Sequence, residues 1–148
     1  MRKNKMQTEI LYQLEESIIE YDPSVPCIIG RHIGFHMSNE FRQFLDKGLE
    51  LMVEKMKEHG KVAWVANLHQ SDVIIEEDNI WAAEDWTPRA LKAGICHTAF
   101  VLHEDEYALA NMNQEVYQDQ IAKNQNEMII GRFKDEESAK AWLREMLK

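Results

Sequence analysis

The chain has 148 residues and a mass of 17.4 kDa, which suits one domain, since a domain of this size buries roughly 70% of the surface of its unfolded chain. Its 45% hydrophobic and 29% charged residues are ordinary globular values, and they exclude disordered, collagen-like and coiled-coil chains. Its 17 basic and 26 acidic residues give a net charge of −9, which disfavours nucleic acids and anionic membranes as partners.

The N-terminus and the cysteines indicate the compartment. Residues 1–5 are basic like the start of a signal peptide, but polar residues 7–9 follow where an apolar segment should begin. No apolar run approaches the roughly 18 residues that span a bilayer. We therefore expect a cytoplasmic protein without a membrane span, in which residues 1–8 form a flexible tail. Cys27 and Cys96 lie in apolar segments without CxxC spacing, which predicts buried packing residues and neither a disulfide nor a zinc knuckle.

Three strands are predicted at the start of the domain. Ile, Leu and Tyr residues fill 10–14 and 17–21, which indicates a short antiparallel pair, and a third strand over 27–33 follows Pro23 and Pro26. The uncovered edge of this hairpin could support a homodimer, although nearby Glu and Lys residues also fit protection of the edge. The sequence leaves the oligomeric state open.

A long amphipathic helix follows. Apolar residues recur from Phe41 to Met56 at the steps that place them on one face of a helix, so this face must be buried. Ser38 is the expected N-cap, and Glu40 favours the positive end of the helix. Gly60 is expected just past its C-terminus.

Strands and helices then alternate. The strand predicted over 61–67 is apolar on both faces, which is typical of a strand inside a sheet that is covered twice. The acidic residues at 76–78 open a helix through Asp85, which breaks or restarts at Thr87 and Pro88.

The C-terminal part repeats this alternation. We predict strands over 96–102 and 128–133, separated by a weakly amphipathic helix over about 104–121. Asp135 caps a final helix that ends the chain. The whole pattern predicts a single α/β domain: a mostly parallel sheet with an antiparallel N-terminal hairpin at its edge and about four helices.

Functional loops of parallel sheets lie at the carboxyl ends of the strands, which points to 67–72 and 103–106. His69, Ser71 and Asp72 lie close together in the first of these loops, so a serine nucleophile with a histidine base is one interpretation. The alternative, which we favour, is that Ser71 and Asp72 shape a turn, because catalytic partners usually converge from separate elements and no G-x-S-x-G elbow is present.

Metal and nucleotide sites have little support. His32 and His36 are four residues apart at a strand end, not on one helical face, and His97 and His103 bracket another strand. The scattered glycines match neither phosphate-binding motif. We therefore predict no cofactor and no metal.

Two tryptophans form the remaining candidate. Trp81 and Trp86 flank Asp85 just before Arg89, where an indole and a guanidinium could stack and mark a recognition surface. The alternative, which we favour, is that both indoles pack their helix against the sheet. An exposed indole here would become the leading contact residue.

Four segments suggest a relative. The segments 61–67, 76–81, 86–94 (Trp-Thr-Pro-Arg-Ala-Leu-Lys-Ala-Gly) and 98–102 together resemble the SpoIIAA-like, STAS-type domains of Bacteroidetes. The resemblance implies a non-catalytic regulatory module that binds a protein partner. It also implies a phosphorylation switch at the helix after a central strand, where Ser71 is the only hydroxyl, although the usual Asp-Ser pair is absent. Together with the tryptophan segment, this loop gives the predicted partner-binding or switch residues, Asn67, His69, Ser71, Asp72, Trp86 and Arg89.

A second function class follows from the same resemblance. CRAL-TRIO-like lipid carriers share this architecture, and Met37, Phe41, Phe44 and Met52 would line an apolar pocket between helix and sheet. An unrecognised enzyme is the third class. Partner binding predicts that Ser71→Glu or Trp86→Ala lowers affinity, a carrier predicts a closed apolar cavity, and an enzyme predicts convergent polar groups with perturbed pKa values.

Overall fold

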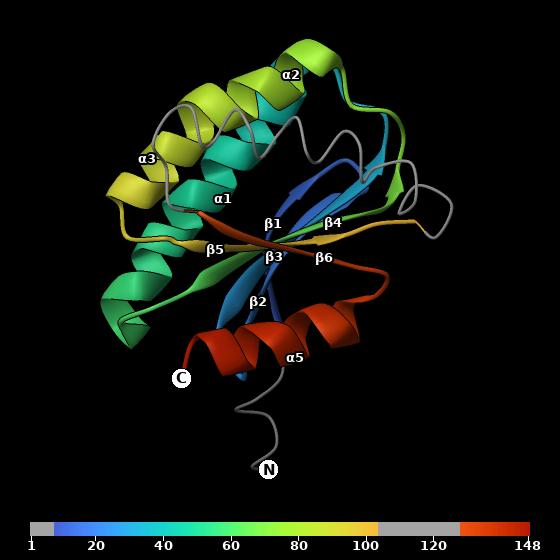
Figure 1. The fold of residues 1–148 in the computed structure, drawn as a ribbon. Helices are drawn as coiled ribbons and strands as arrows, with labels where there is room; N and C mark the ends of the chain where they lie inside the picture. The colour runs from blue at the N-terminus through green and yellow to red at the C-terminus, as the bar shows by residue number, and fades with distance from the viewer. Residues whose placement is uncertain (1–7, 104–127) are drawn as a thin grey trace.

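The computed structural model describes residues 8–103 and 128–148. Within them a six-stranded sheet has its strands in chain order (Figure 1). The strands are β1 (Glu9–Leu14), β2 (Ser17–Asp22), β3 (Cys27–Gly34), β4 (Ala63–Ser71), β5 (His97–Val101) and β6 (Ile129–Phe133). The helical elements are α1 (Ser38–His59), α2 (Glu76–Trp81), a π-helical segment (Ala82–Trp86), α3 (Thr87–Lys92) and α5 (Glu136–Met146).

The pairing of the strands confirms the predicted fold class. β1, β2 and β3 pair antiparallel, whereas β3/β4, β4/β5 and β5/β6 pair parallel. The helix expected over 104–121 and most of the N-terminal tail fall outside the described residues. No helix in the described part of the chain is both long and apolar enough to cross a membrane.

Helices cover both faces of the sheet. In Figure 1, α1, α2 and α3 lie on one face and α5 lies on the other. β4 serves both layers because its side chains alternate: Trp64 belongs to the core beneath α1, whereas Ala63 and Val65 belong to the core beneath α5. This confirms the strand that was predicted to be apolar on both sides.

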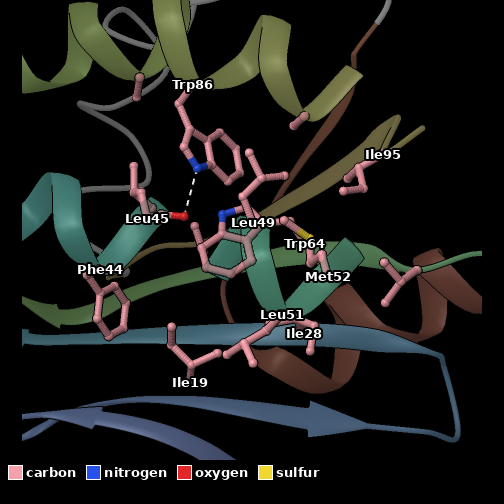
Figure 2. Packing of buried hydrophobic residues seen from close by; sticks show 14 of the residues in the cluster. Ile19, Ile28, Phe44, Leu45, Leu49, Leu51, Met52, Trp64, Trp86 and Ile95 are labelled. Atoms are coloured by element: carbon pink, nitrogen blue, oxygen red, sulfur yellow. Dashed lines mark hydrogen bonds between the residues drawn. The ribbon is translucent and has the colours of Figure 1, made fainter. Parts of the chain in front are cut away.

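The core beneath α1 is built around two indoles. Trp64 and Trp86 lie with their ring centroids 5.6 Å apart, and Figure 2 shows the Trp86 Nε1–H donating to the carbonyl oxygen of Leu45, 2.8 Å away. The predicted apolar stripe of α1, including Phe44 and Met52, is buried in the same core.

The C-terminal end of α1 matches the prediction, whereas its N-terminal end does not. Gly60 follows the helix with φ of 86°, in the left-handed region, as expected. Ser38, however, is the first residue of the helix and not its N-cap, which is Met37. The Ser38 hydroxyl instead donates to the carboxylate of Asp78 in α2, 3.0 Å away. A tertiary hydrogen bond has replaced the local one.

One further boundary differs from the predictions, at the end of β4. β4 continues through Ser71, where a polar loop was expected, because β3 pairs with it up to Gly34 and Ser71 after a register shift. The predicted restart is confirmed, because α3 begins at Thr87 with Pro88 in its first turn, directly after the π-helical segment and without an intervening loop. Cys27 is fully buried as predicted, whereas Cys96 is only partly buried.

Candidate functional site at the carboxyl edge of the sheet

A cavity lies at the carboxyl edge of the parallel strands, where a functional site was expected. Its volume is about 320 Å³, and β3, β4, β5 and the start of α5 enclose it. The lining residues are Arg31, His32, Ile33, Asn67, His69, Gln70, Val101, Lys134, Asp135 and Glu136. The cavity therefore includes Asn67 and His69 from the predicted contact set and adds charged residues from β3 and α5.

Two charged side chains of this cavity, Arg31 and Glu136, are paired with each other. The Arg31 guanidinium donates from Nε and Nη2 to the two carboxylate oxygens of Glu136, at 2.7 and 2.9 Å, and it also forms an ion pair with Glu20. Asn67 donates its amide N–H to Glu136 as well. These contacts join β2, β3, β4 and α5.

The paired charges have shifted pKa values. Burial alone would raise the pKa of Glu136, but hydrogen bonds from Arg31 and Asn67 outweigh it and hold the pKa below its ordinary value. The hydrogen bond to Glu136 raises the pKa of Arg31 further above its normal range, against the opposing effect of burial. Both groups therefore stay charged at neutral pH, which suits a structural network and not an acid or base that exchanges protons.

Two imidazoles lie at this edge. His69 and His103 have ring centroids 5.1 Å apart, and both residues are exposed. Within residues 8–103 and 128–148, no three His, Cys, Asp or Glu residues are grouped so that they could hold a metal ion. His32 and His36 instead point into the core, where the His32 ring lies 4.8 Å from that of Phe44.

The end of β4 and the residues after it are held by hydrogen bonds between short polar side chains and the backbone. The Ser71 hydroxyl donates to the carbonyl oxygen of Asp72, and the Asp72 carboxylate accepts from the backbone N–H of Val73, at 2.7 and 2.9 Å. The backbone N–H of His69 donates to the side chain of Asn67. These bonds confirm the interpretation in which short polar side chains shape the backbone here.

Trp86 does not belong to the surface. Only 3% of it is exposed, because it packs α3 and the π-helical segment against α1 and Trp64. It cannot contact a partner, and Trp86→Ala would test stability, not binding. Arg89 is exposed and pairs with Asp46 and Asp85. Its guanidinium lies over the indole of Trp81, so the expected stacking forms there and not with Trp86.

The four residues proposed for an apolar pocket do not share a cavity. Phe44 and Met52 are fully buried in close contact with the core, and 60% of Met37 is exposed. Phe41 lines a second cavity of about 10 Å³, which has room for about one water molecule.

A serine and a histidine that the sequence did not single out do meet. The Ser17 Oγ lies 2.7 Å from His36 Nε2, and His36 Nδ1 lies 3.7 Å from a carboxylate oxygen of Glu40. Ser17 is fully buried, and its Oγ also accepts the backbone N–H of Ile33 at 2.9 Å. A nucleophile must reach its substrate, so this group is a structural link between β2 and the end of β3. Ser17 and His36 are 19 positions apart, and no motif between them would have revealed this contact.

Three large apolar side chains are exposed at the same edge of the sheet. Phe35 and Met37, in the loop between β3 and α1, are 45% and 60% exposed, and Val73, after β4, is 70% exposed. The two loops begin side by side, because the backbone N–H of Asp72 donates to the carbonyl oxygen of Gly34 at 2.9 Å. We call Phe35, Met37 and Val73 the edge patch. Phe35 and Val73 were not among the sequence candidates, although apolar residues directly after two parallel strands were a visible signal.

Comparisons with known proteins add no relative. A scan against protein-family models gives no match, and searches of curated proteins and of solved structures give no significant match either.

Proposed function

We propose that the protein is a non-catalytic interaction module that binds a protein partner through the edge patch. The observation that carries the proposal is the exposure of three large apolar side chains at one place on the sheet edge. Large apolar side chains gathered on a surface commonly mark contact sites, whereas single ones do not. The carboxyl edge of a parallel sheet is also where functional loops gather.

The polar residues next to the patch support the same function. Asn67, His69, Ser71 and Asp72 follow one another along the end of β4, and the STAS-type resemblance implies that this segment contacts the partner. Ser71 is partly exposed, so a kinase could reach its hydroxyl. A phosphate there would add charge next to the patch and change the affinity for the partner. Arg89 lies on α3 and extends the proposed surface along the helical layer.

The state of the ionisable groups supports a non-catalytic module. At the cavity, the side chains of Arg31 and Glu136 form an ion pair with each other. In the core, Ser17 and His36 meet but are buried. An enzyme would need such groups to be free to exchange protons with a substrate.

Capture experiments with matched variants test this proposal. The double variant Met37→Ser/Val73→Ser removes most of the exposed apolar area, and Ile10→Ser, at a residue that is 59% exposed on β1, is the control. We expect crosslinked partners from cell extract to be retained by the wild type and by the control, and to be lost with the double variant. Retention of the same partners by the double variant would show that the edge patch is not the contact surface.

Native mass spectrometry separates this function from the carrier alternative. Because the residues named for the apolar pocket pack against one another, we expect the mass of the chain alone, or a multiple of it. A few hundred daltons of additional mass, released on denaturation, would favour the carrier.

A further inference from the structure

The edge patch rests on anchored backbone. On one side Gly34 and Ser71 are paired at the end of the β3/β4 ladder. On the other side the carboxylate of Asp78, which is 1% exposed, accepts hydrogen bonds from Ser38 and Arg42 and so holds the start of α1 to α2. A surface that is already ordered loses little entropy when a partner binds.

The two segments that carry the patch are rich in carboxylates. The two segments that carry it, residues 32–41 and 67–80, contain five carboxylates and no Lys or Arg: Glu40, Asp72, Glu76, Glu77 and Asp78. Asp78 is buried and paired with Arg42. Asp72, Glu76 and Glu77 are exposed, and Glu40 is half-buried, so the segments that carry the three apolar side chains also present four carboxylates that are not paired with Lys or Arg in the contacts described.

This combination selects the chemistry of the partner. A surface with its own excess of carboxylates repels a second copy of itself, an anionic membrane and a nucleic acid. It attracts a segment that presents apolar side chains between Lys or Arg residues, and an amphipathic helix provides both on adjacent faces. We infer that the edge patch binds a basic amphipathic helix of a partner protein.

This inference rests on the proposed function and adds the class of the partner. Negative charge added at Ser71 would attract a basic helix more strongly. Ser71→Glu should therefore increase the affinity, which reverses the loss of affinity predicted from the sequence.

Binding of defined peptides tests the inference. The probe is a fluorescently labelled amphipathic helix made of Leu and Lys, and the comparison peptide has Glu in place of every Lys. We expect the Leu/Lys peptide to bind the wild type at low salt, to bind more weakly at high salt, and to bind at least about tenfold more tightly than the Leu/Glu peptide.

Two pairs of variants separate specific binding from attraction by the net charge. Met37→Ser/Val73→Ser should lower the affinity about tenfold, whereas Ile10→Ser should not change it. Glu76→Gln/Glu77→Gln should weaken binding and reduce its dependence on salt. Glu54→Gln/Glu58→Gln, with the same change of net charge in exposed residues near the other end of α1, should leave both nearly unchanged.

The possible results distinguish the basic partner, the edge patch and the proposed function from one another. If the two carboxylate double variants weaken peptide binding equally, or if the Leu/Lys peptide does not bind at low salt, the inference of a basic partner is wrong. The capture experiment would still decide the proposed function. Patch-dependent binding of the Leu/Glu peptide would keep the edge patch as a docking site and overturn its preference for basic partners. Peptide binding that is independent of the patch, together with unchanged capture, would overturn both.

Discussion

At the scale of single residues, His32 shows how burial controls a titration. It is 2% exposed, and among the described residues its Nδ1 has no hydrogen-bond partner. Burial, and to a lesser extent the neighbouring His36, lowers the pKa of His32 from 6.5 to about 3. The imidazole is therefore neutral in the folded protein at neutral pH.

This shift predicts a loss of stability in mild acid. Below pH 6.5 the unfolded chain binds a proton at His32, whereas the folded protein does not until about pH 3, so the free energy of unfolding falls as the pH decreases through this window. One such group contributes up to about 1.4 kcal/mol per pH unit. Urea unfolding of His32→Leu between pH 6.5 and about 5, above the range of ordinary carboxylates, should show a smaller slope than the wild type.

A control isolates the contribution of His32. Burial lowers the pKa of His97 as well, so part of the slope should persist in the variant. The same substitution at the exposed His59 is the matched control for replacing a histidine by leucine. A His32→Leu protein with the full wild-type slope would mean that His32 is accessible to protons in the folded state.

At the scale of elements, the packing of α1 on the sheet depends on glycine. A Cβ atom built on Gly48 of α1 would lie 2.8 Å from two ring atoms of Trp64, and one built on Gly30 of β3 would lie 2.6 Å from the same indole. These approaches are shorter than real Cβ contacts, so a methyl group at either position must move the helix, the strand or the ring. The indole thus fills the space that two glycines leave open.

Gly48→Ala should therefore destabilise the protein, although Ala favours a helix by about 1 kcal/mol over Gly. Overpacking of a core typically costs about 1 to 3 kcal/mol, and we expect a net loss of about 1 kcal/mol in urea unfolding. In a Trp64→Phe background the same substitution should cost less, because the smaller ring gives it room. An equal cost in both backgrounds would mean that Trp64 is not the obstacle.

At the scale of the whole molecule, α5 connects the end of the chain to its beginning. Lys140 in α5 forms a 2.8 Å ion pair with Asp22 at the end of β2, and both side chains are nearly buried. Burial opposes the charged form of Asp22, but hydrogen bonds from Lys140 and Ser24 outweigh it and lower the pKa of Asp22. Together with the Arg31–Glu136 pair, this contact holds α5 against the sheet at two points one turn apart on the same face of the helix.

Removing one partner should cost more than removing both. Lys140→Met leaves the buried Asp22 carboxylate unpaired, and we expect it to lower the free energy of unfolding by about 3 kcal/mol. The double variant Lys140→Met/Asp22→Asn, which keeps an oxygen near Ser24, should recover most of the loss. The reference is Lys148→Met, in an exposed pair with Glu145, which should change the stability by less than about 1 kcal/mol. A double variant as unstable as Lys140→Met would show that the ion pair itself is required.

Much of the fold was predictable because its signals are local. The alternation of Ala63, Trp64 and Val65, the stripe of α1 and the cap at Asp135 each follow from residues near one another in sequence, and each is confirmed. The candidate site was predictable only in its position. Asn67 and His69 do line the cavity, but Trp86 is buried, since burial depends on what the other elements place over it.

The sequence by itself therefore determined the class of the fold and the type of most described elements, because periodicity and capping act over a few residues. Tertiary structure alone decided which side chains share a place. In the folded chain Arg31 pairs with Glu136, which is 105 positions away, and Ser17 lies beside His36. The three side chains of the edge patch are exposed. Contacts between distant segments depend on how the strands are ordered and which face each helix covers, and no short stretch of sequence contains that information.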